Sequence, residues 1–287
     1  MVPRPAARPR LAVTLGDPRG IGPEVVDKAL AAPSPLAADV TLLGRTEHGA
    51  GLTAEEAGRV AGHTIEEAAR LALAGTVDAI VTGPVHKQAL HAAGYRYPGV
   101  TEFLAHLAGD VPVAMMLTTG KLRVVLVTTH LALRDVPGQL TTERIVQAGR
   151  ITADALGRWW GMAAPRLAVC ALNPHAGEGG LFGDEDERVL RPAAGTLGAA
   201  GPLPADTVFV KALRGDFDAV LAPYHDVGMT AVKVAGFGQG VNVTLGLPFI
   251  RTAPDHGTAL DIAGTGKADA GSMRAALELA AQLASRR

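Results

Sequence analysis

The sequence lacks the features that would place the chain outside a reducing, aqueous compartment. It contains one cysteine, Cys170, so no internal disulfide can form. No apolar run approaches the ~20 residues that a membrane helix needs, and no signal-peptide-like stretch follows the Pro- and Arg-rich segment 1–10. We therefore expect a cytoplasmic protein, and we interpret Cys170, which lies in an apolar run, as a core residue.

Charge of either sign is also scarce. Charged residues make up 19% of the chain and the net charge is -1. Without a basic excess nothing favours nucleic acid as a partner, and without an acidic block nothing indicates a disordered tail. Hydrophobic residues make up 48% of 287 positions, which is enough for a sizeable core in one large or two mid-sized domains.

Short apolar runs alternate with stretches of helical periodicity. Strands are predicted at 11–15, 40–44, 78–82, 111–118, 122–129, 166–172 and 217–222, and helices at 23–32, 63–75, 101–108, 141–160 and 272–287. This alternation predicts an α/β fold with mostly parallel sheets flanked by helices. The neighbouring strands 111–118 and 122–129 break that rule and predict an antiparallel element. We expect two domains without a flexible tether.

Three histidines share one kind of placement. His130, His175 and His225 each follow the carboxyl end of an apolar predicted strand, which is the edge where α/β sheets bind ligands. Three converging imidazoles would hold a divalent metal and leave positions open for a substrate. The alternative is three ordinary loop residues, and their wide spacing does not decide between the two. The remaining candidates lie in polar or helical stretches and are interpreted as surface or core residues: His48, His63, His91 and His106.

Three glycine-rich segments could approach a phosphate or a cofactor. Segment 16–24 lies between a strand and a helix start, where backbone N–H groups attract anions, although a tight turn explains it equally well. Segment 236–240 lacks that context and is a weak nucleotide motif. Segment 255–269 is small and polar, so its glycines allow close backbone approach to ribose and adenine. A structured surface loop is the alternative.

Four polar residues in the second half of the chain are further candidates. Lys233, Asn242 and Arg251 fall in apolar stretches, where a charge is costly unless it is paired or near the surface. Arg251 suits bidentate binding of phosphate or carboxylate, and a salt bridge or a solvated position is the alternative. Asp206 follows a rigid turn and is either a helix cap, which its residue type favours, or a catalytic carboxylate.

Together these segments resemble the 4-hydroxythreonine-4-phosphate dehydrogenase family. The similarity runs from about Leu11 to the C-terminus, with its most specific stretches at 81–87, 173–180, 201–207, 224–226 and 246–261. The loop 255–266 is also similar to the adenine-side loop of isocitrate and isopropylmalate dehydrogenases, which implies their two-domain fold. Residues 1–99 with 249–287 would then form the cofactor-side domain, and residues 100–248 the metal, substrate and dimerisation domain.

The resemblance implies a role for each candidate. His130, His175 and His225 would bind the metal, with zinc preferred and Co, Mn, Ni or Mg as alternatives. The substrate would contact Thr101, Lys233, Asn242 and Arg251, and NAD or NADP would contact His256, Gly257, Thr258 and Asp261. Lys233 and Asp206 are the candidates for the general base. Members of the family are homodimers with the active site at the interface, which allows metal ligands to come from both chains.

The activity implied is metal-dependent, NAD(P)-linked oxidation and then decarboxylation of a phosphorylated hydroxy acid, 4-phosphohydroxy-L-threonine in vitamin B6 biosynthesis. Two departures from the family pattern stand out. Val100 stands where the family has a histidine before Thr101, which leaves the substrate open. The region 45–62 looks shortened, and we expect part of the cofactor domain, or a loop covering the cleft, to be trimmed there. The alternatives are a related dehydrogenase of D-threonate or D-erythronate 4-phosphate, or of an aromatic dihydrodiol. Neither a phosphate acetyltransferase nor a binding protein without chemistry would need three histidines at strand ends.

Overall fold

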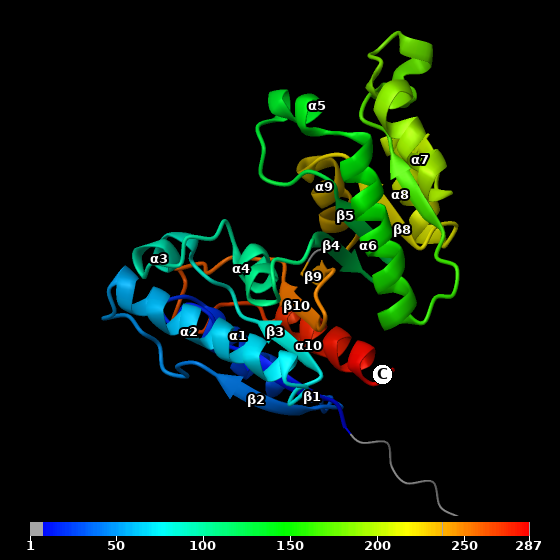
Figure 1. The fold of residues 1–287 in the computed structure, drawn as a ribbon. Helices are drawn as coiled ribbons and strands as arrows, with labels where there is room; N and C mark the ends of the chain where they lie inside the picture. Colours follow the sequence, from blue (N-terminus) through cyan, green and yellow to red (C-terminus); the bar gives the residue numbers. More distant parts are fainter. Residues whose placement is uncertain (1–7, 237, 287) are drawn as a thin grey trace, which may run out of the picture. The chain divides into compact units, whose positions relative to one another are not determined.

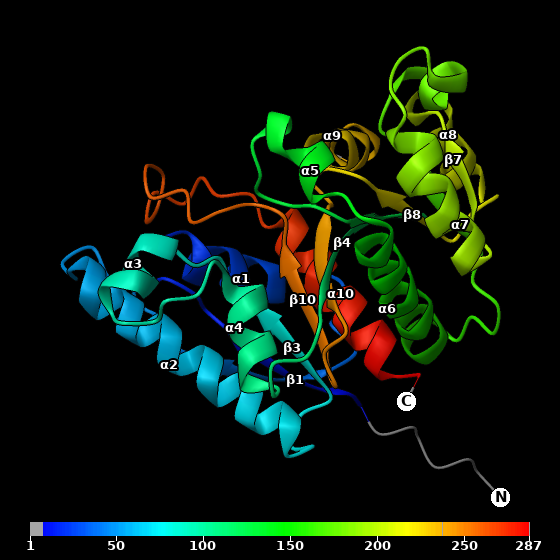
Figure 2. The same cartoon turned by 45° about the horizontal axis from the view of Figure 1, so that its top comes forward.

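The computed structural model describes residues 8–236 and 238–286, which fold into two compact units (Figures 1 and 2). The first unit combines residues 1–112 with 247–287, and the second comprises residues 113–246. Residues 1–7 and 287 of the first predicted domain, and Phe237 of segment 236–240, lie outside the described residues. The domain limits expected after residues 99 and 248 stay a prediction, and Thr101 lies in the first unit.

The sheet of the first unit is parallel. Its strands follow the order β2-β1-β3-β10, with bounds Asp39–Leu43, Arg10–Thr14, Ala79–Thr82 and Ile250–Pro254. Strand β1 lies between β2 and β3, so the connection from β1 leads to a strand on one side of it and the connection from β2 leads to a strand on its other side. Such a change of side opens a crevice at the carboxyl ends of the strands, where α/β proteins bind ligands.

The described residues of the first unit form the helices α1 (Gly22–Leu30), α2 (Ala54–Leu73), α3 (Lys87–Ala92), α4 (Val100–Leu107) and α10 (Gly271–Ala284). Helix α2 begins nine residues before the predicted helix at 63–75, because Thr53 and Glu56 form a reciprocal capping box at its start. Helix α2 packs on β1 and β3 and also on α3 and α4, whereas α10 packs on α1, β3 and β10. The short helix α3 was not predicted.

The sheet of the second unit is mixed. Its strands follow the order β9-β4-β5-β8-β6-β7, with bounds Val241–Leu245, Ala114–Thr119, Leu122–Leu126, Ala219–Ala222, Leu167–Cys170 and Ala200–Leu203. Strand β4 pairs antiparallel with β5 and β9, which confirms the predicted antiparallel element. The pairs from β5 through β8 and β6 to β7 are parallel. The α/β class with mostly parallel pairing is confirmed.

The helices described in the second unit are α5 (Val136–Gln139), α6 (Thr142–Trp160), α7 (Arg191–Leu197), α8 (Ala205–Arg214) and α9 (His225–Ala235), of which α6 to α9 pack on strands of the sheet. Val208 and Phe209 of α8 and Val232 of α9 pack with the side chains of β5, β6 and β8 in one apolar core. Cys170 belongs to that core and is fully buried, and burial raises the pKa of its thiol to about 12. No helix in the described part of the chain is long and apolar enough to cross a membrane.

Candidate functional site

Two of the three predicted metal ligands lie side by side in the second unit. Strands β5 and β8 are parallel neighbours, His130 follows β5, and His225 begins α9 directly after β8. The parallel pairing therefore brings both residues to one edge of the sheet, and their ring centroids are 5.6 Å apart. A small cavity of about 110 Å³ lies here, lined by Thr129, His130, Leu131, Leu133, Val136, Tyr224, His225 and Asp226.

Asp226 orients one of these imidazoles, a role that was not predicted. Its Oδ1 lies 2.6 Å from His225 Nδ1, so Nδ1 is engaged and Nε2 is left to face a ligand. A carboxylate behind a histidine fixes its tautomer and raises its basicity, and metal-binding histidines commonly have such a partner. The motif Tyr224-His225-Asp226 carried the signal, since a carboxylate stands directly beside the histidine.

The third predicted ligand, His175, lies in an unusual loop after β6. His175, Ala176 and Glu178 have φ angles of 51°, 55° and 43°, which is the left-handed region that non-glycine residues rarely adopt. The fully buried carboxylate of Asp186 accepts hydrogen bonds from the backbone N–H groups of Leu172 (2.9 Å) and Asn173 (3.0 Å) and so anchors the start of this loop. Backbone in a disfavoured conformation often marks a functional site.

Within one chain, the described residues contain no group of three His, Cys, Asp or Glu side chains close enough to hold a metal ion. The structure thus brings His130 and His225 together, and the triad with His175 stays a prediction. The two adjacent imidazoles, one of them oriented by a carboxylate, are a donor set suited to zinc and similar divalent metals.

The other predicted residues of the second unit are spread over three elements. Lys233 lies half-buried in the last turn of α9, and Asn242 lies in β9, where its Oδ1 is buried and has no hydrogen-bond partner in the described part of the chain. Asp206 is exposed in the first turn of α8, whose N-cap is Pro204. The interpretation of Asp206 as a helix cap is therefore wrong, because the residue lies inside the helix.

In the first unit, three loops meet at the carboxyl ends of β1, β3 and β10. The backbone N–H of Asp17 donates to Pro84 O (3.0 Å), and that of Ile21 donates to Thr258 O (2.9 Å). Gly16 has a φ of +76°, and a Cβ there would collide with Pro84 O. Segment 16–24 is thus a closely packed turn, and it contacts the segment 255–269 that was predicted to bind the cofactor.

The predicted cofactor residues differ in exposure. Thr258 is buried, His256 is half-buried and its Nε2 has no partner in the described residues, and Gly257 and Asp261 are exposed. Glu24 and Lys28 of α1 hold the end of this segment. The Glu24 carboxylate accepts from the Ala268 N–H (2.9 Å), and Lys28 Nζ donates to Ala268 O (2.8 Å). The hydrogen bond with Lys28 is also the main reason why the pKa of Glu24 is lowered.

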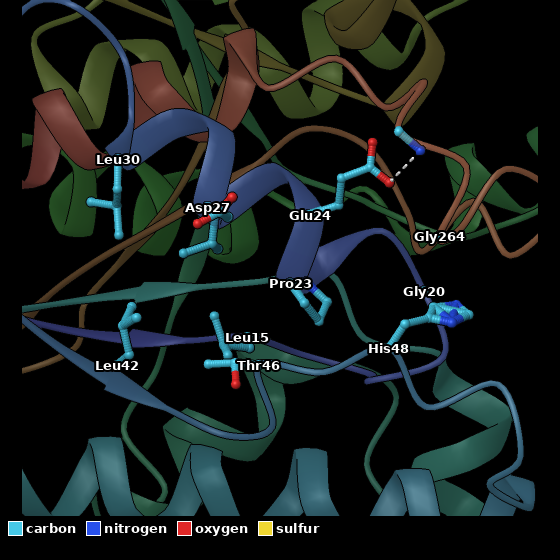
Figure 3. A pocket seen from close by; sticks show the side chains of 12 residues that line it. Leu15, Gly20, Pro23, Glu24, Asp27, Leu30, Leu42, Thr46, His48 and Gly264 are labelled. Carbon is cyan, nitrogen blue, oxygen red and sulfur yellow. Dashed lines mark hydrogen bonds between the residues drawn. The ribbon is translucent and has the colours of Figure 1, made fainter.

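A larger cavity of about 390 Å³ lies beside this segment, between α1 and the ends of β1 and β2 (Figure 3). Its size is within the usual range of small-molecule sites. Its apolar side chains include Leu15, Leu30 and Leu42, and Gly264 and Gly266 border it on the side of the predicted cofactor segment. The ring of His48 would lie 3.3 Å from a Cβ on Gly264, so this backbone approaches the ring closely, and the φ of +73° at Gly264 favours glycine.

Arg251 is a buried cation at the second position of β10. Its side chain donates to Thr82 Oγ1 from Nε (3.1 Å) and from a terminal nitrogen (2.6 Å). Burial lowers its pKa to about 10 while nearby Glu102 opposes that shift, so the guanidinium stays protonated at neutral pH. Thr101, the other predicted substrate contact of this unit, is buried at the start of α4.

Comparison with known proteins identifies the family. The family described as "Pyridoxal phosphate biosynthetic protein PdxA" matches residues 24–280. The chain belongs to this family. It is 44% identical to the 4-hydroxythreonine-4-phosphate dehydrogenase of Geobacter metallireducens, over 98% of this chain and 97% of that protein. It is 42% identical to the D-threonate 4-phosphate dehydrogenase of Salmonella typhimurium, over 96% and 98% of the two chains. Membership of this family makes the chain an oxidoreductase.

Solved structures agree with the family assignment. The crystal structure of 4-hydroxythreonine-4-phosphate dehydrogenase from Klebsiella pneumoniae matches with a TM-score of 0.87 and 41% identity, over 96% of this chain and 99% of that one. An isocitrate dehydrogenase from Methylococcus capsulatus matches with a TM-score of 0.52 at 16% identity, which confirms the predicted fold alone. The Geobacter alignment spans 329 positions, more than the 287 residues of this chain, so that relative carries residues that this chain lacks.

Proposed function

We propose that this PdxA-family protein is a metal-dependent, NAD(P)-linked dehydrogenase that oxidises and then decarboxylates 4-phosphohydroxy-L-threonine. The observation that carries the proposal is the pair of imidazoles, His130 and His225, at the ends of two neighbouring parallel strands. Relatives with the matching name cover nearly the whole chain. The proposed assembly is a cytoplasmic homodimer, and zinc is the proposed metal.

The proposal assigns a role to every candidate residue. His130, His175 and His225 hold the metal, and Asp226 keeps His225 in the tautomer that presents Nε2. When bound, the metal lowers the pKa of the substrate hydroxyl and stabilises the negative charge that develops on oxygen. Lys233 or Asp206 accepts the hydroxyl proton. The anionic substrate is oriented by Thr101, Lys233, Asn242 and Arg251, and the nicotinamide cofactor is held by His256, Gly257, Thr258 and Asp261.

A second substrate deserves the same test because of one residue. Val100 begins α4 directly before Thr101, and it replaces the histidine typical of the family with an apolar side chain that cannot hydrogen-bond a substrate. A relative named D-threonate 4-phosphate dehydrogenase is 42% identical to this chain. D-threonate 4-phosphate and D-erythronate 4-phosphate are therefore the alternative substrates.

The test follows NADH and NADPH formation at neutral pH with each of the three phosphorylated acids, with and without a chelator. Chelator-sensitive turnover of 4-phosphohydroxy-L-threonine is the expected result. Turnover of a sugar-acid phosphate alone would keep the metal-dependent dehydrogenase and change its substrate. The variant His175→Ala should lose metal-dependent turnover, while His63→Ala, on the exposed face of α2, should keep it. Near-normal activity of His175→Ala in metal-free buffer would contradict the mechanism.

A further inference from the structure

Three polar side chains form a row across the sheet of the first unit. In the parallel register Thr14 pairs with Thr82, and Arg251 pairs with Ile80, two residues before Thr82. Side chains two residues apart on a strand share a face, so Thr14, Thr82 and Arg251 all project from one face. Thr14 and Thr82 are the last residues of β1 and β3, and Arg251, the second residue of β10, reaches Thr82 with its side chain. The next residue, Thr252, projects from the opposite face, where its hydroxyl donates to Ala276 O of α10 (2.8 Å).

The starts of two helices lie next to each other on the Arg251 side of this sheet. A Cβ built on Gly99, the N-cap of α4, would lie 3.0 Å from the Glu102 carboxylate and 3.9 Å from Lys87 Cε. Glu102 in turn acts electrostatically on Arg251. Glu102 therefore links the first turn of α4 to the guanidinium, and the Lys87 side chain lies beside that turn. His86 is the N-cap of α3, directly before Lys87 and four residues after Thr82, the hydrogen-bond partner of Arg251.

Two buried polar atoms in this region have no hydrogen-bond partner among the described residues: Thr14 Oγ1 and His86 Nδ1. Thr14 is fully buried. An unpartnered buried polar atom lowers stability, and proteins seldom keep one unless water, an ion or a ligand satisfies it. Neither atom is used in the function proposed above.

We propose that Thr14 Oγ1 and His86 Nδ1 are substrate contacts that bind, together with Arg251, an oxyanion at one end of the substrate. This inference rests on the proposed dehydrogenase function and extends its substrate site. The Thr14 hydroxyl donates a hydrogen bond to the anion, and His86 donates from Nδ1 in the tautomer that carries its proton there. Arg251 supplies a fixed positive charge, Lys87 a second one at the exposed side, and the first turn of α4 supplies backbone N–H groups. Glu102 offsets part of this charge.

The anion is either the phosphate or the carboxylate of the substrate, and both present the same oxygen acceptors. The test measures, by titration calorimetry on the full-length protein, the affinity for inorganic phosphate, D-erythronate, D-erythronate 4-phosphate and NAD. The variants are Thr14→Val, which keeps the shape of the side chain, and His86→Leu. The matched control is Thr252→Val, because that buried hydroxyl lies on the same sheet and already has a partner.

We expect Thr14→Val and His86→Leu each to weaken binding of D-erythronate 4-phosphate by about 10- to 100-fold, the usual effect of losing a hydrogen bond to a charged group. Binding of NAD should not change. Thr14→Val should unfold at the same temperature as the wild type or higher, because an unpartnered hydroxyl is removed, whereas Thr252→Val should unfold at a lower temperature and keep its affinity.

The affinities for the different ligands show whether the site binds the phosphate or the carboxylate of the substrate. Weaker binding of inorganic phosphate and of the phosphorylated acid, but not of D-erythronate, identifies the phosphate, and weaker binding of both acids with unchanged phosphate affinity identifies the carboxylate. Unchanged affinity for all anions in both variants, or a loss of NAD binding instead, would overturn the proposal. Since phosphate binding needs no turnover, the site can hold even if the wild-type protein fails as a dehydrogenase.

Discussion

The two units hold their candidate polar groups in contrasting ways. In the first unit, Arg251 and Thr14 are buried, and the loops above the strands touch backbone to backbone at Gly16 and Pro84. In the second unit, His130 and His175 are exposed and His225 is only partly covered. A buried site is part of the core, so damage to it should lower stability. An exposed site contributes little to the stability of the fold, so a substitution in it should lower only the affinity for the ligand. Ordering variants by their effect on the free energy of unfolding tests this contrast.

The largest effect is expected from Gly16→Ala in the first unit. The residue has a φ of +76°, and an added Cβ would collide with Pro84 O. Both the strained backbone and the collision destabilise the folded state, by about 3 kcal/mol or more. Urea unfolding measures the loss. The control is Gly51→Ala in the same unit, where a Cβ would meet nothing within 4 Å. Equal stabilities for the two variants would show that the packed turn is not part of the core.

Asp186→Asn should have the next largest effect on the free energy of unfolding. This variant tests whether a buried carboxylate of the second unit stabilises the loop of His175. The Asp186 carboxylate accepts two backbone N–H groups in front of the loop of His175. An amide replaces one acceptor oxygen by a donor, so one buried N–H loses its partner at a cost of about 1–3 kcal/mol. Asp184→Asn, which changes an exposed carboxylate nearby, is the control. If both variants unfold like the wild type, the loop does not depend on this carboxylate.

The same contrast explains what could be predicted from sequence. Strand ends can be located from apolar runs, so the placement of His130 and His225 at strand ends was predicted. The structure adds that the two strands are parallel neighbours and that the two rings are close. Helix α9 was not predicted, because its sequence has small residues such as Gly228, which packs against Val124 and Leu126. Tertiary packing forms this helix, and no local pattern reports it.

The buried groups of the first unit could be predicted only in part. Arg251 was singled out because a charge in an apolar stretch is costly. The contact between segments 16–24 and 255–269, and the row of Thr14, Thr82 and Arg251, depend on the register of β1, β3 and β10. Register joins residues far apart in sequence, so composition and periodicity carry no signal for it. The left-handed backbone conformation of residues 175–179 could not be predicted either, because only two of these five residues are glycines, the residue type that signals this conformation.

Cys170 gives a smaller effect that depends on pH. Burial raises the pKa of its thiol to about 12, above its ordinary value of 9.0, and nearby Asp186 adds to the shift. The neutral thiol is therefore favoured in the folded state, and its stabilising contribution is complete below about pH 9 and is lost as the pH rises toward 12. The wild type should lose stability more steeply between pH 9 and 11 than Cys170→Ala. Parallel curves would mean that the thiol ionises equally well in the folded protein.

The smallest effect on unfolding is expected at the exposed histidines of the second unit, where the effect on binding should be large. His225→Ala should change the free energy of unfolding without metal by no more than about 0.5 kcal/mol, because its side chain is partly exposed and its ring lies against His130 and Asp226, which are themselves exposed. The same variant should bind zinc far more weakly, and Asp226→Asn, which removes only the orienting carboxylate, should weaken zinc binding by about 10- to 100-fold.

The zinc affinities of both variants are measured by competition with a chromogenic chelator, with His63→Ala as the control. If His225→Ala loses stability but keeps its zinc affinity, the contrast between the two units is wrong, because His130 and His225 would then stabilise the fold instead of binding a metal. We expect zinc affinity to fall in the order wild type, Asp226→Asn, His225→Ala, while the free energy of unfolding stays constant. That result would mean that the fold positions these imidazoles for metal binding and does not depend on them for its stability.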